Sequence, residues 1–448
     1  MLVAVFALAL ACRVAGQVAL GAYLHPEEWE YEVIASNVLN GHGYAYPAAG
    51  TTYVASTASP LYVWLAVVVY ALTAHSQVAL LLVQAVLGAV AAVLCAWLGL
   101  RLYGVAASWV AGLLAATHPA LVVYAAKLHS LTLDAFVVCL VIAAFVALPR
   151  RPTIRQMALL GGLIGLAALT RSTVLLLVPA GLLWSWRFRG VRPVSGAGAA
   201  LVAAALVVFA PWSIRSSLLL GQPVLVSSES TEWLWRGNNP NATGSSWTSD
   251  GRTMFEAADP AFQQRVVAAA EAGRIGIYRD AALAFIRASP GRAVALYGAK
   301  LAAFWWTSPS AGLEYPGWWA RAYNAYYLVL AACAAVGLVA GLRAARSRDG
   351  VLLILATLAL VALGQSVFYV EGRHRWEVES LLLVLAAGGV RAISYQLSAS
   401  DANRRHITYQ LSAISRDGKP TWETQRSKAE LTADSYRGGW SAAMLCRP

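Results

Sequence analysis

The sequence contains little charge for its length. Only 12% of its 448 residues are charged, whereas 59% are hydrophobic. Soluble domains carry about 25% charged residues, and a soluble fold with this composition would have too little polar surface to present to water. The composition therefore excludes an ordinary soluble enzyme or a soluble binding module.

The motifs of several soluble enzyme classes are also missing. The chain has no Gly-Lys-Ser/Thr phosphate-binding loop, no His-Glu-x-x-His zinc helix and no Gly-x-Ser-x-Gly nucleophile turn. None of its five cysteines has metal-ligand spacing, so we interpret them as small core hydrophobes. The spacing predicts no metal site and no certain cofactor.

Long apolar runs are what the sequence has instead. Residues Gln77–Leu102 and Gly196–Leu220 contain almost no charge, and about 20 such residues span the ~30 Å hydrocarbon layer of a bilayer. Met1–Leu24 has no clean small-residue cleavage site, so we interpret it as a first transmembrane helix and not as a signal peptide. We predict an all-α polytopic membrane protein with about ten to twelve hydrophobic helices. The segment Pro60–Ala74 is too short to be assigned as a crossing.

The formal charge of +12 is concentrated in short arginine clusters between the apolar runs. Such clusters are typical of cytoplasmic loops under the positive-inside bias, and a topology signal is a better explanation of them than nucleic-acid binding. This topology predicts a transmembrane domain over residues 1–393 with outer loops at 25–59 and 221–292. Residues 394–448 are polar and basic, and we expect a loosely ordered tail. The clusters are Arg150, Arg151 and Arg155, then Arg187, Arg189 and Arg192, then Arg343, Arg346 and Arg348.

The segment after the first helix carries four carboxylates within six positions, at Glu27, Glu28, Glu30 and Glu32. Pro26 fits the first turn of a helix, and acidic side chains suit the positive end of its dipole. One interpretation is a solvated acidic face on a surface helix. The other is that one carboxylate points into a cavity under the outer loop, where it accepts a proton or holds a divalent cation. The residues alone leave both open.

Cationic side chains are predicted at the outer ends of several spans. Ionisable groups near membrane depth are costly and mark functional sites, and the guanidinium fork suits phosphate oxygens. A phosphate-bearing lipid head group is one partner for these cations, and pairing with Glu371, Glu377 or Glu379 is the other. His129 and Asp134 form a further polar group before a long span. The cations are Arg171, Arg215, Lys300, Arg373 and Arg375.

In this order, these features resemble the GT-C superfamily of polyprenyl-phosphate-sugar-dependent glycosyltransferases, which includes protein O-mannosyltransferases and aminoarabinose transferases. Glu stands where the family usually has the first Asp of an Asp-Glu pair, and His374 replaces a central Tyr. The matching motifs, over roughly Met1–Ile393, are Glu27-Glu28 with Tyr31, Gly41-His42-Gly43-Tyr44, Ser59-Pro60-Leu61-Tyr62, Gly165-Leu166-Ala167-Ala168-Leu169-Thr170-Arg171, Pro211-Trp212-Ser213-Ile214-Arg215, Gly237-Asn238-Asn239-Pro240 with Thr243-Gly244, and Arg373-His374-Arg375.

The resemblance implies an inverting membrane glycosyltransferase that moves a sugar from a polyprenyl-phosphate donor to a hydroxyl of a lipid, glycan or protein acceptor. It places the site at the outer face of a bacterial plasma membrane, within the cell envelope. Glu27 or Glu28 would take the acceptor proton. The donor phosphate would be held by Arg373, Arg375 and Arg171, with Arg215 or Lys300 helping. Further pocket candidates are Tyr31, His129, Asp134, Asn238 and His374.

Two alternatives stay open at this stage. A transporter or flippase for a lipid-linked sugar would carry polar residues near mid-span and internal repeats across two halves, and neither is present in the sequence. A lipid-binding protein without catalysis would not need the carboxylates.

Overall fold

The computed structural model describes residues 1–48, 50–55, 58–306 and 317–416. Within them, six helices are long and apolar enough to cross a membrane, and four shorter apolar helices accompany them. The protein is therefore a helical multi-pass membrane protein, as the sequence predicts. The long helices are α1 (Leu2–Ala19), α4 (Gln77–Tyr103), α10 (Gly196–Leu220), α15 (Gly317–Arg343), α16 (Arg348–Gln365) and the first part of α17 (Gly372–Arg416); the shorter ones are α3 (Pro60–Thr73), α5 (Val105–Thr117), α7 (Leu131–Ala147) and α8 (Ile154–Ala168).

The centre of the bundle is the first part of α17, which packs against α4, α5, α7 and α15. Its residues Val378 and Leu381 are fully buried. Small residues bring α15 and α17 together, because a Cβ atom on Gly337 would lie 1.8 Å from the carbonyl oxygen of Leu385. Close backbone contact of this kind is a common way for helices to associate in a membrane.

A second helix pair forms beside this bundle. Helix α8 packs along α10, and the 3-10 helix η1 (Ser172–Leu176) and α9 (Leu177–Arg189) follow α8. At the end of α9, Arg189 Nη1 pairs with Asp349 Oδ2 at 2.6 Å. Asp349 opens α16, so two of the arginine clusters lie at the same end of the bundle. At the opposite end of the bundle, Arg171 precedes η1 and Gln365 ends α16, and both residues line one cavity.

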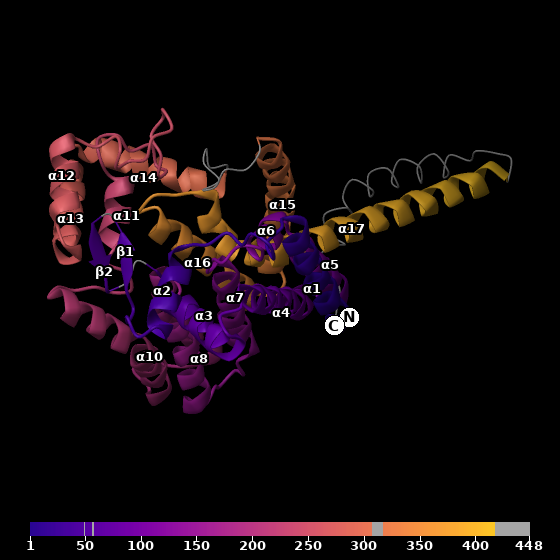
Figure 1. The fold of residues 1–448 in the computed structure, drawn as a ribbon. Helices are drawn as coiled ribbons and strands as arrows, with labels where there is room; N and C mark the ends of the chain where they lie inside the picture. Colours follow the sequence, from indigo (N-terminus) through magenta and orange to yellow (C-terminus); the bar gives the residue numbers. More distant parts are fainter. Residues whose placement is uncertain (49, 56–57, 307–316, 417–448) are drawn as a thin grey trace.

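The loops predicted on the outer side form a small folded layer of their own. It contains α2 (Glu30–Leu39), the hairpin of β1 (Tyr46–Ala48) and β2 (Thr51–Tyr53), α11 (Ser230–Gly237), α12 (Pro260–Ala268), α13 (Glu271–Ala288) and α14 (Pro290–Trp305). The short helix α6 (Pro119–Tyr124) instead packs against α1, α5 and α7. Figure 1 shows α11 to α14 gathered on one side, with the hairpin beside α11. Trp235 stacks on Phe262 with ring centroids 4.9 Å apart and also contacts Tyr278, so this layer has a separate aromatic core.

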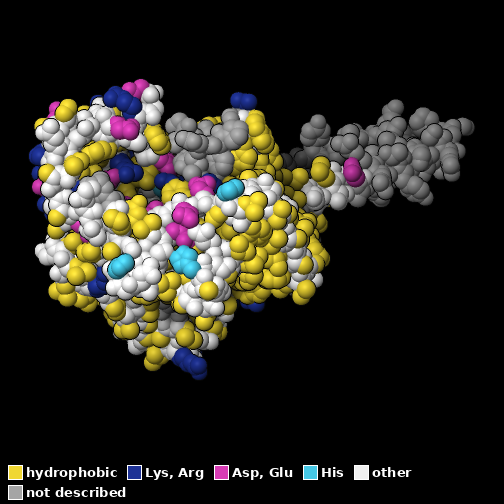
Figure 2. All heavy atoms as spheres, in the orientation of Figure 1, with side chains coloured by type: hydrophobic (Ala, Val, Ile, Leu, Met, Phe, Trp, Pro, Cys, Tyr) yellow, Lys and Arg dark blue, Asp and Glu magenta, His cyan; other side chains and the backbone are white. Residues whose placement is uncertain are grey.

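The surface over α1, α4 and α5 is largely apolar (Figure 2). Exposed side chains such as Leu82, Val86 and Leu113 belong to it, as a lipid-facing surface requires.

Helix α17 continues beyond the bundle and projects away from it (Figure 1). We expected a loosely ordered tail from Ser394, but the structure is helical through Arg416. No Gly or Pro interrupts residues 391–416, so nothing in this stretch terminates the helix. The rest of the expected tail, residues 417–448, lies outside the described residues.

Candidate functional site

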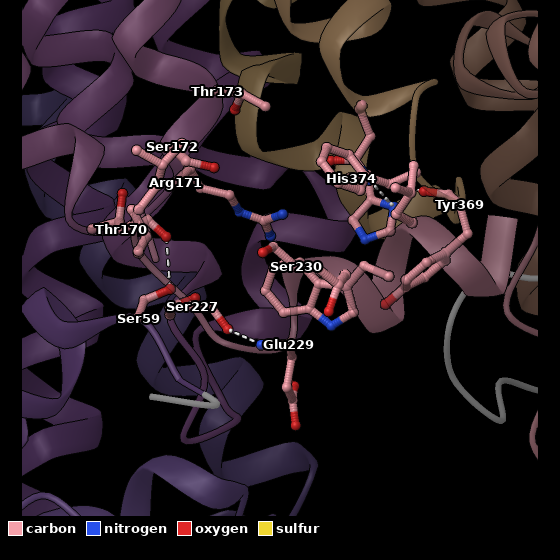
Figure 3. A pocket seen from close by; sticks show the side chains of 18 of the residues that line it. Ser59, Thr170, Arg171, Ser172, Thr173, Ser227, Glu229, Ser230, Tyr369 and His374 are labelled. Atoms are coloured by element: carbon pink, nitrogen blue, oxygen red, sulfur yellow. Dashed lines mark hydrogen bonds between the residues drawn. The ribbon is translucent and has the colours of Figure 1, made fainter. Parts of the chain in front are cut away.

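One cavity of about 710 Å³ lies between α2, the start of η1, α11 and the start of α17. Segments from both ends of the chain therefore contribute to it, together with the outer layer. Figure 3 shows part of its lining, with Arg171 and His374 on facing sides. The residues used below that line it are Glu30, Tyr31, His129, Arg171, Thr173, Glu229, Ser230, Thr231, Trp233, Arg373 and His374.

Arg171 is the first cationic group of the cavity. It lies just before η1, and its Nε atom pairs with Glu377 Oε2 at 2.6 Å and with Asp134 Oδ2 at 3.2 Å. Burial opposes the charge, but the two carboxylates outweigh it and raise the pKa of Arg171. Because both ion pairs use Nε, the terminal nitrogens remain for the cavity, into which the side chain extends in Figure 3.

Arg373 supplies the second cationic group. Its Nη2 atom pairs with Glu371 Oε2 at 3.0 Å and donates to the hydroxyl of Tyr369 at 3.4 Å. Glu371 in turn accepts a hydrogen bond from Ser246 of the outer layer. The guanidinium carbon lies 5.7 Å from the centre of the Trp29 ring. Arg373 is therefore fixed in place while it lines the cavity.

Glu30 is a carboxylate that lines the same cavity near Arg373. It is the first residue of α2, where the helix dipole favours an acidic side chain. Its side chain makes no hydrogen bond or ion pair with another residue of the described segments. Burial raises the pKa of Glu30, and the nearby Arg373 charge opposes this shift. Such a carboxylate can take up a proton more readily than a fully solvated one.

A polar chain connects Tyr31 to Arg171 through Ser130 and Asp134, and His129 packs beside Tyr31. The Tyr31 hydroxyl donates to Ser130 Oγ at 3.2 Å, and Ser130 Oγ donates to Asp134 Oδ2 at 3.1 Å. His129 accepts from the backbone N–H of Leu131 through Nδ1 at 3.0 Å. Burial lowers the pKa of His129, and the surrounding cations add to this effect. A neutral ring that accepts through Nδ1 carries its proton on Nε2.

His374 has a similar arrangement on the opposite side of the cavity. Its Nδ1 atom accepts from the backbone N–H of Glu371 at 3.0 Å. One cavity therefore brings together Tyr31, His129, Arg171, Arg373 and His374. Asp134 does not line it and instead pairs with Arg171.

Glu27 and Glu28 do not line this cavity. Glu27 forms an ion pair with Lys127 and has a side chain that is 45% exposed, and Glu28 accepts from Gln77 Nε2 at 2.6 Å at the surface. We expected the helix to begin at Pro26, but it begins at Glu30. Residues before it are extended, and the backbone of Glu27 pairs with that of Lys127. The geometric expectation that one of these two carboxylates points into the cavity was therefore wrong.

Arg375 also lies outside the cavity. It is buried, and its Nη1 atom donates to the carbonyl oxygens of Phe304 and Trp306, both at 2.9 Å. Its Nε atom lies 3.5 Å from Glu379 Oε2. Arg375 therefore connects α17 with the end of α14.

The other two predicted phosphate ligands also bind protein groups outside the cavity. Arg215 Nη2 donates to the carbonyl oxygen of Val54 at 2.9 Å. Lys300 Nζ donates to the carbonyl oxygen of Gly237 and to Asn238 Oδ1, both at 3.2 Å. Asn238 is buried and also donates to Val367 O at 2.9 Å. These residues stabilise the outer layer against the bundle.

Two cavity residues were missed in the sequence, Glu229 and Trp233 of the outer loop. Both lie in a polar stretch with no motif, and only the fold of α11 directs them inward. For metals, the described ranges contain no group of three or more His, Cys, Asp or Glu side chains able to hold an ion. A divalent cation at the acidic segment thus stays a prediction.

Comparison with known proteins gives one family match and several structural ones. Residues 57–214 match the family described as dolichyl-phosphate-mannose-protein mannosyltransferase. Comparison with the curated proteins finds no significant match. The oligosaccharyltransferase of Archaeoglobus fulgidus, solved with zinc and sulfate, aligns at a TM-score of 0.50 and 16% identity, over 92% of this chain and 51% of its own.

A further structural match is ArnT from Cupriavidus metallidurans bound to undecaprenyl phosphate. It aligns at a TM-score of 0.42 and 16% identity, over 90% of this chain and 79% of its own. The present chain spans about half the length of the oligosaccharyltransferase structures it matches. The family match over residues 57–214 and the fold shared with the oligosaccharyltransferase agree with the GT-C resemblance that the sequence predicts.

Proposed function

We propose that this protein is a membrane glycosyltransferase that transfers a sugar from a polyprenyl-phosphate donor to a hydroxyl group of an acceptor. One observation carries the proposal: a single cavity is lined by two fixed guanidinium groups, Arg171 and Arg373, and by Glu30, a carboxylate without a partner among the described residues. The family matched by residues 57–214 uses a dolichyl-phosphate-linked sugar according to its description, which agrees with this assignment.

The roles follow from the charges. Arg171 and Arg373 bind the donor phosphate and stabilise the negative charge that grows on it as it leaves. Glu30 removes the proton from the acceptor hydroxyl. The acceptor oxygen then forms a bond to the anomeric carbon as the bond between that carbon and the phosphate oxygen breaks, and the lipid phosphate leaves with the electron pair. Attack from the side opposite the leaving group inverts the anomeric configuration.

We assign the cavity to the outer face of a bacterial plasma membrane. Arg189 and Asp349 lie at one end of α9 and α16, beside the arginine clusters, and the cavity adjoins the other ends. The 18 residues of α16 span roughly 27 Å at 1.5 Å per residue, close to the hydrocarbon thickness. If the arginine clusters are cytoplasmic, the cavity opens on the opposite side. Its position at the ends of these helices gives no support to the transporter alternative.

The test is a transfer assay with purified protein in lipid nanodiscs. The donors would be polyprenyl-phosphate hexoses, and the acceptors would be extracted from cell envelopes. Wild type should release free polyprenyl phosphate in an acceptor-dependent manner, and Glu30→Gln should not. Glu27→Gln is the matched control, because it removes a neighbouring carboxylate outside the cavity and should retain transfer. Equal activity in wild type and Glu30→Gln would overturn the assignment.

A further inference from the structure

The cavity contains a second carboxylate, Glu229, immediately before α11. Its backbone N–H donates to Ser227 Oγ at 3.1 Å, but its side chain pairs with no other residue of the described ranges. Neighbouring acids are already engaged: Glu232 pairs with Arg236, and Glu271 accepts from the backbone N–H of Val54 at 2.6 Å. Among these three glutamates, Glu229 is therefore the one whose carboxylate is available to a ligand.

Glu229 points away from Arg171. Figure 3 shows its side chain pointing away from Arg171 and His374. The cavity therefore has Arg171 and Arg373 in one region and Glu229 in another, where the nearby Arg236 is already paired with Glu232. A donor phosphate bound by the first region leaves the second for another molecule.

An aromatic ring accompanies this carboxylate. Trp233 follows Glu229 by four residues, its backbone N–H bonds to the Glu229 carbonyl oxygen at 2.9 Å, and it lines the same cavity. Among the residues described, no other aromatic ring packs against its indole. Tryptophan presents a large rigid face together with a polar N–H, so it offers a flat platform beside the carboxylate.

Two hydroxyl groups in the cavity are also unpaired. Thr231 Oγ1 and Thr173 Oγ1 are buried and have no hydrogen-bond partner in the described part of the chain, although both residues line the cavity. Buried polar atoms are costly when they stay without partners. A ligand with several hydroxyl groups bound at Glu229 would offer a partner to Thr231, two residues further along the chain, whereas Thr173 lies at the other end of the cavity lining (Figure 3).

From this arrangement we propose that the acceptor is a saccharide, bound by Glu229 through its hydroxyl groups and stacked on Trp233. The inference rests on the proposed function, since it names the acceptor of the same reaction. Neighbouring sugar hydroxyls donate to the carboxylate oxygens, and the apolar face of the sugar ring lies on the indole. One hydroxyl of the bound saccharide is then directed toward Glu30.

The test is saturation-transfer NMR on wild-type protein in nanodiscs. The probes are the methyl glycosides of glucose, galactose and mannose and, separately, a hexapeptide rich in Ser and Thr. Wild type should bind at least one glycoside. Glu229→Ala should weaken that binding by about tenfold or more, because a hydrogen bond to a charged group is lost. Trp233→Ala should also weaken it, because the sugar loses the aromatic face on which it stacks. Trp247→Ala and Glu28→Ala, exposed positions outside the cavity, should leave it unchanged.

Undecaprenyl phosphate binding, measured by native mass spectrometry on the same samples, separates this inference from the proposed function. Retained lipid binding in Glu229→Ala and Trp233→Ala with lost glycoside binding supports the saccharide site. Three outcomes overturn it while lipid binding persists: no glycoside binding in wild type, binding of the peptide alone, or glycoside binding unaffected by the two variants. Absence of undecaprenyl phosphate binding in wild type would instead overturn the proposed function.

Discussion

Arg373 and Arg375 are separated by a single residue, yet they face different surroundings. Arg373 lines the cavity beside Trp29, whereas Arg375 is buried against the end of α14 and its guanidinium carbon lies 3.6 Å from the Tyr327 ring centre. Successive residues in an α-helix are rotated by about 100°, so positions two apart point in nearly opposite directions. The motif Arg-His-Arg therefore contains one ligand-binding candidate and one structural cation.

We expect Arg373→Ala to affect lipid-phosphate binding and Arg375→Ala to affect the stability of the fold. Arg373→Ala should weaken undecaprenyl phosphate binding by about tenfold or more, because a charged hydrogen bond is lost. Its effect on folding should be the smaller one, because Glu371 keeps the hydrogen bond from Ser246 and no contact between α14 and α17 is removed. Arg375→Ala leaves Glu379 in a buried position without its guanidinium partner, which costs about 3–5 kcal/mol. It should lower the unfolding temperature markedly. Native mass spectrometry and thermal unfolding in detergent measure the two effects, and the reverse pattern would contradict the assignment.

If Glu30 is the general base, glutamine variants of the neighbouring glutamates should differ from Glu30→Gln in their rate of sugar transfer. Glu30→Gln should reduce the rate of transfer by at least about a hundredfold, the range expected for loss of a general base. Glu27→Gln and Glu28→Gln should stay within about threefold of wild type, because these side chains lie outside the cavity. Initial rates at saturating donor provide the measurement. A large loss in Glu27→Gln with an active Glu30→Gln would restore the expectation from the sequence.

Glu32 gives a pH-dependent prediction away from the cavity. Burial raises the pKa of Glu32 to about 7, with Gln77 opposing the shift and Glu28 adding to it; its carboxyl accepts a hydrogen bond from Tyr70. An unfolded glutamate has a pKa of about 4.3. The folded state therefore favours the protonated form, and this contribution is complete below about pH 4.3 and is lost as the pH rises to about 7.

The unfolding temperature of Glu32→Gln should accordingly depend less on pH than that of wild type. Relative to wild type, the variant should gain stability between about pH 4.5 and 7 and keep that gain at pH 8. Glu28→Gln removes the exposed carboxylate that adds to the pKa shift of Glu32 and should change the wild-type profile only slightly, because burial is the main cause. A Glu32→Gln profile parallel to that of wild type would show that Glu32 does not titrate in this range.

Close packing of α15 on α17 leads to a prediction on stability. Gly337→Ala places a methyl group where the Leu385 carbonyl oxygen lies 1.8 Å away, so the helices must separate. Overpacking of this kind costs about 1–3 kcal/mol. Gly298→Ala on α14 is a matched control, since a Cβ atom there has no atom within 4 Å and alanine favours the helix. Thermal unfolding should separate the two variants, and equal stability would argue against the contact.

Much of the membrane architecture follows from the sequence alone. Low charge and long apolar runs determine a helical membrane protein, because a bilayer forces every backbone polar group into internal hydrogen bonds. The order of short motifs identified the GT-C resemblance. It also brought Tyr31, His129, Arg171, Arg373 and His374 to attention before their contacts were known.

Tertiary structure decided which polar groups meet. Four glutamates lie within six positions, and the start of α2 determines that Glu30, not Glu27 or Glu28, faces the cavity. Glu229 comes from an outer loop about 200 residues away, in a stretch without a motif. Side-chain type and spacing fix the chemistry a residue can perform, but the direction of each side chain depends on where a helix begins and what packs against it.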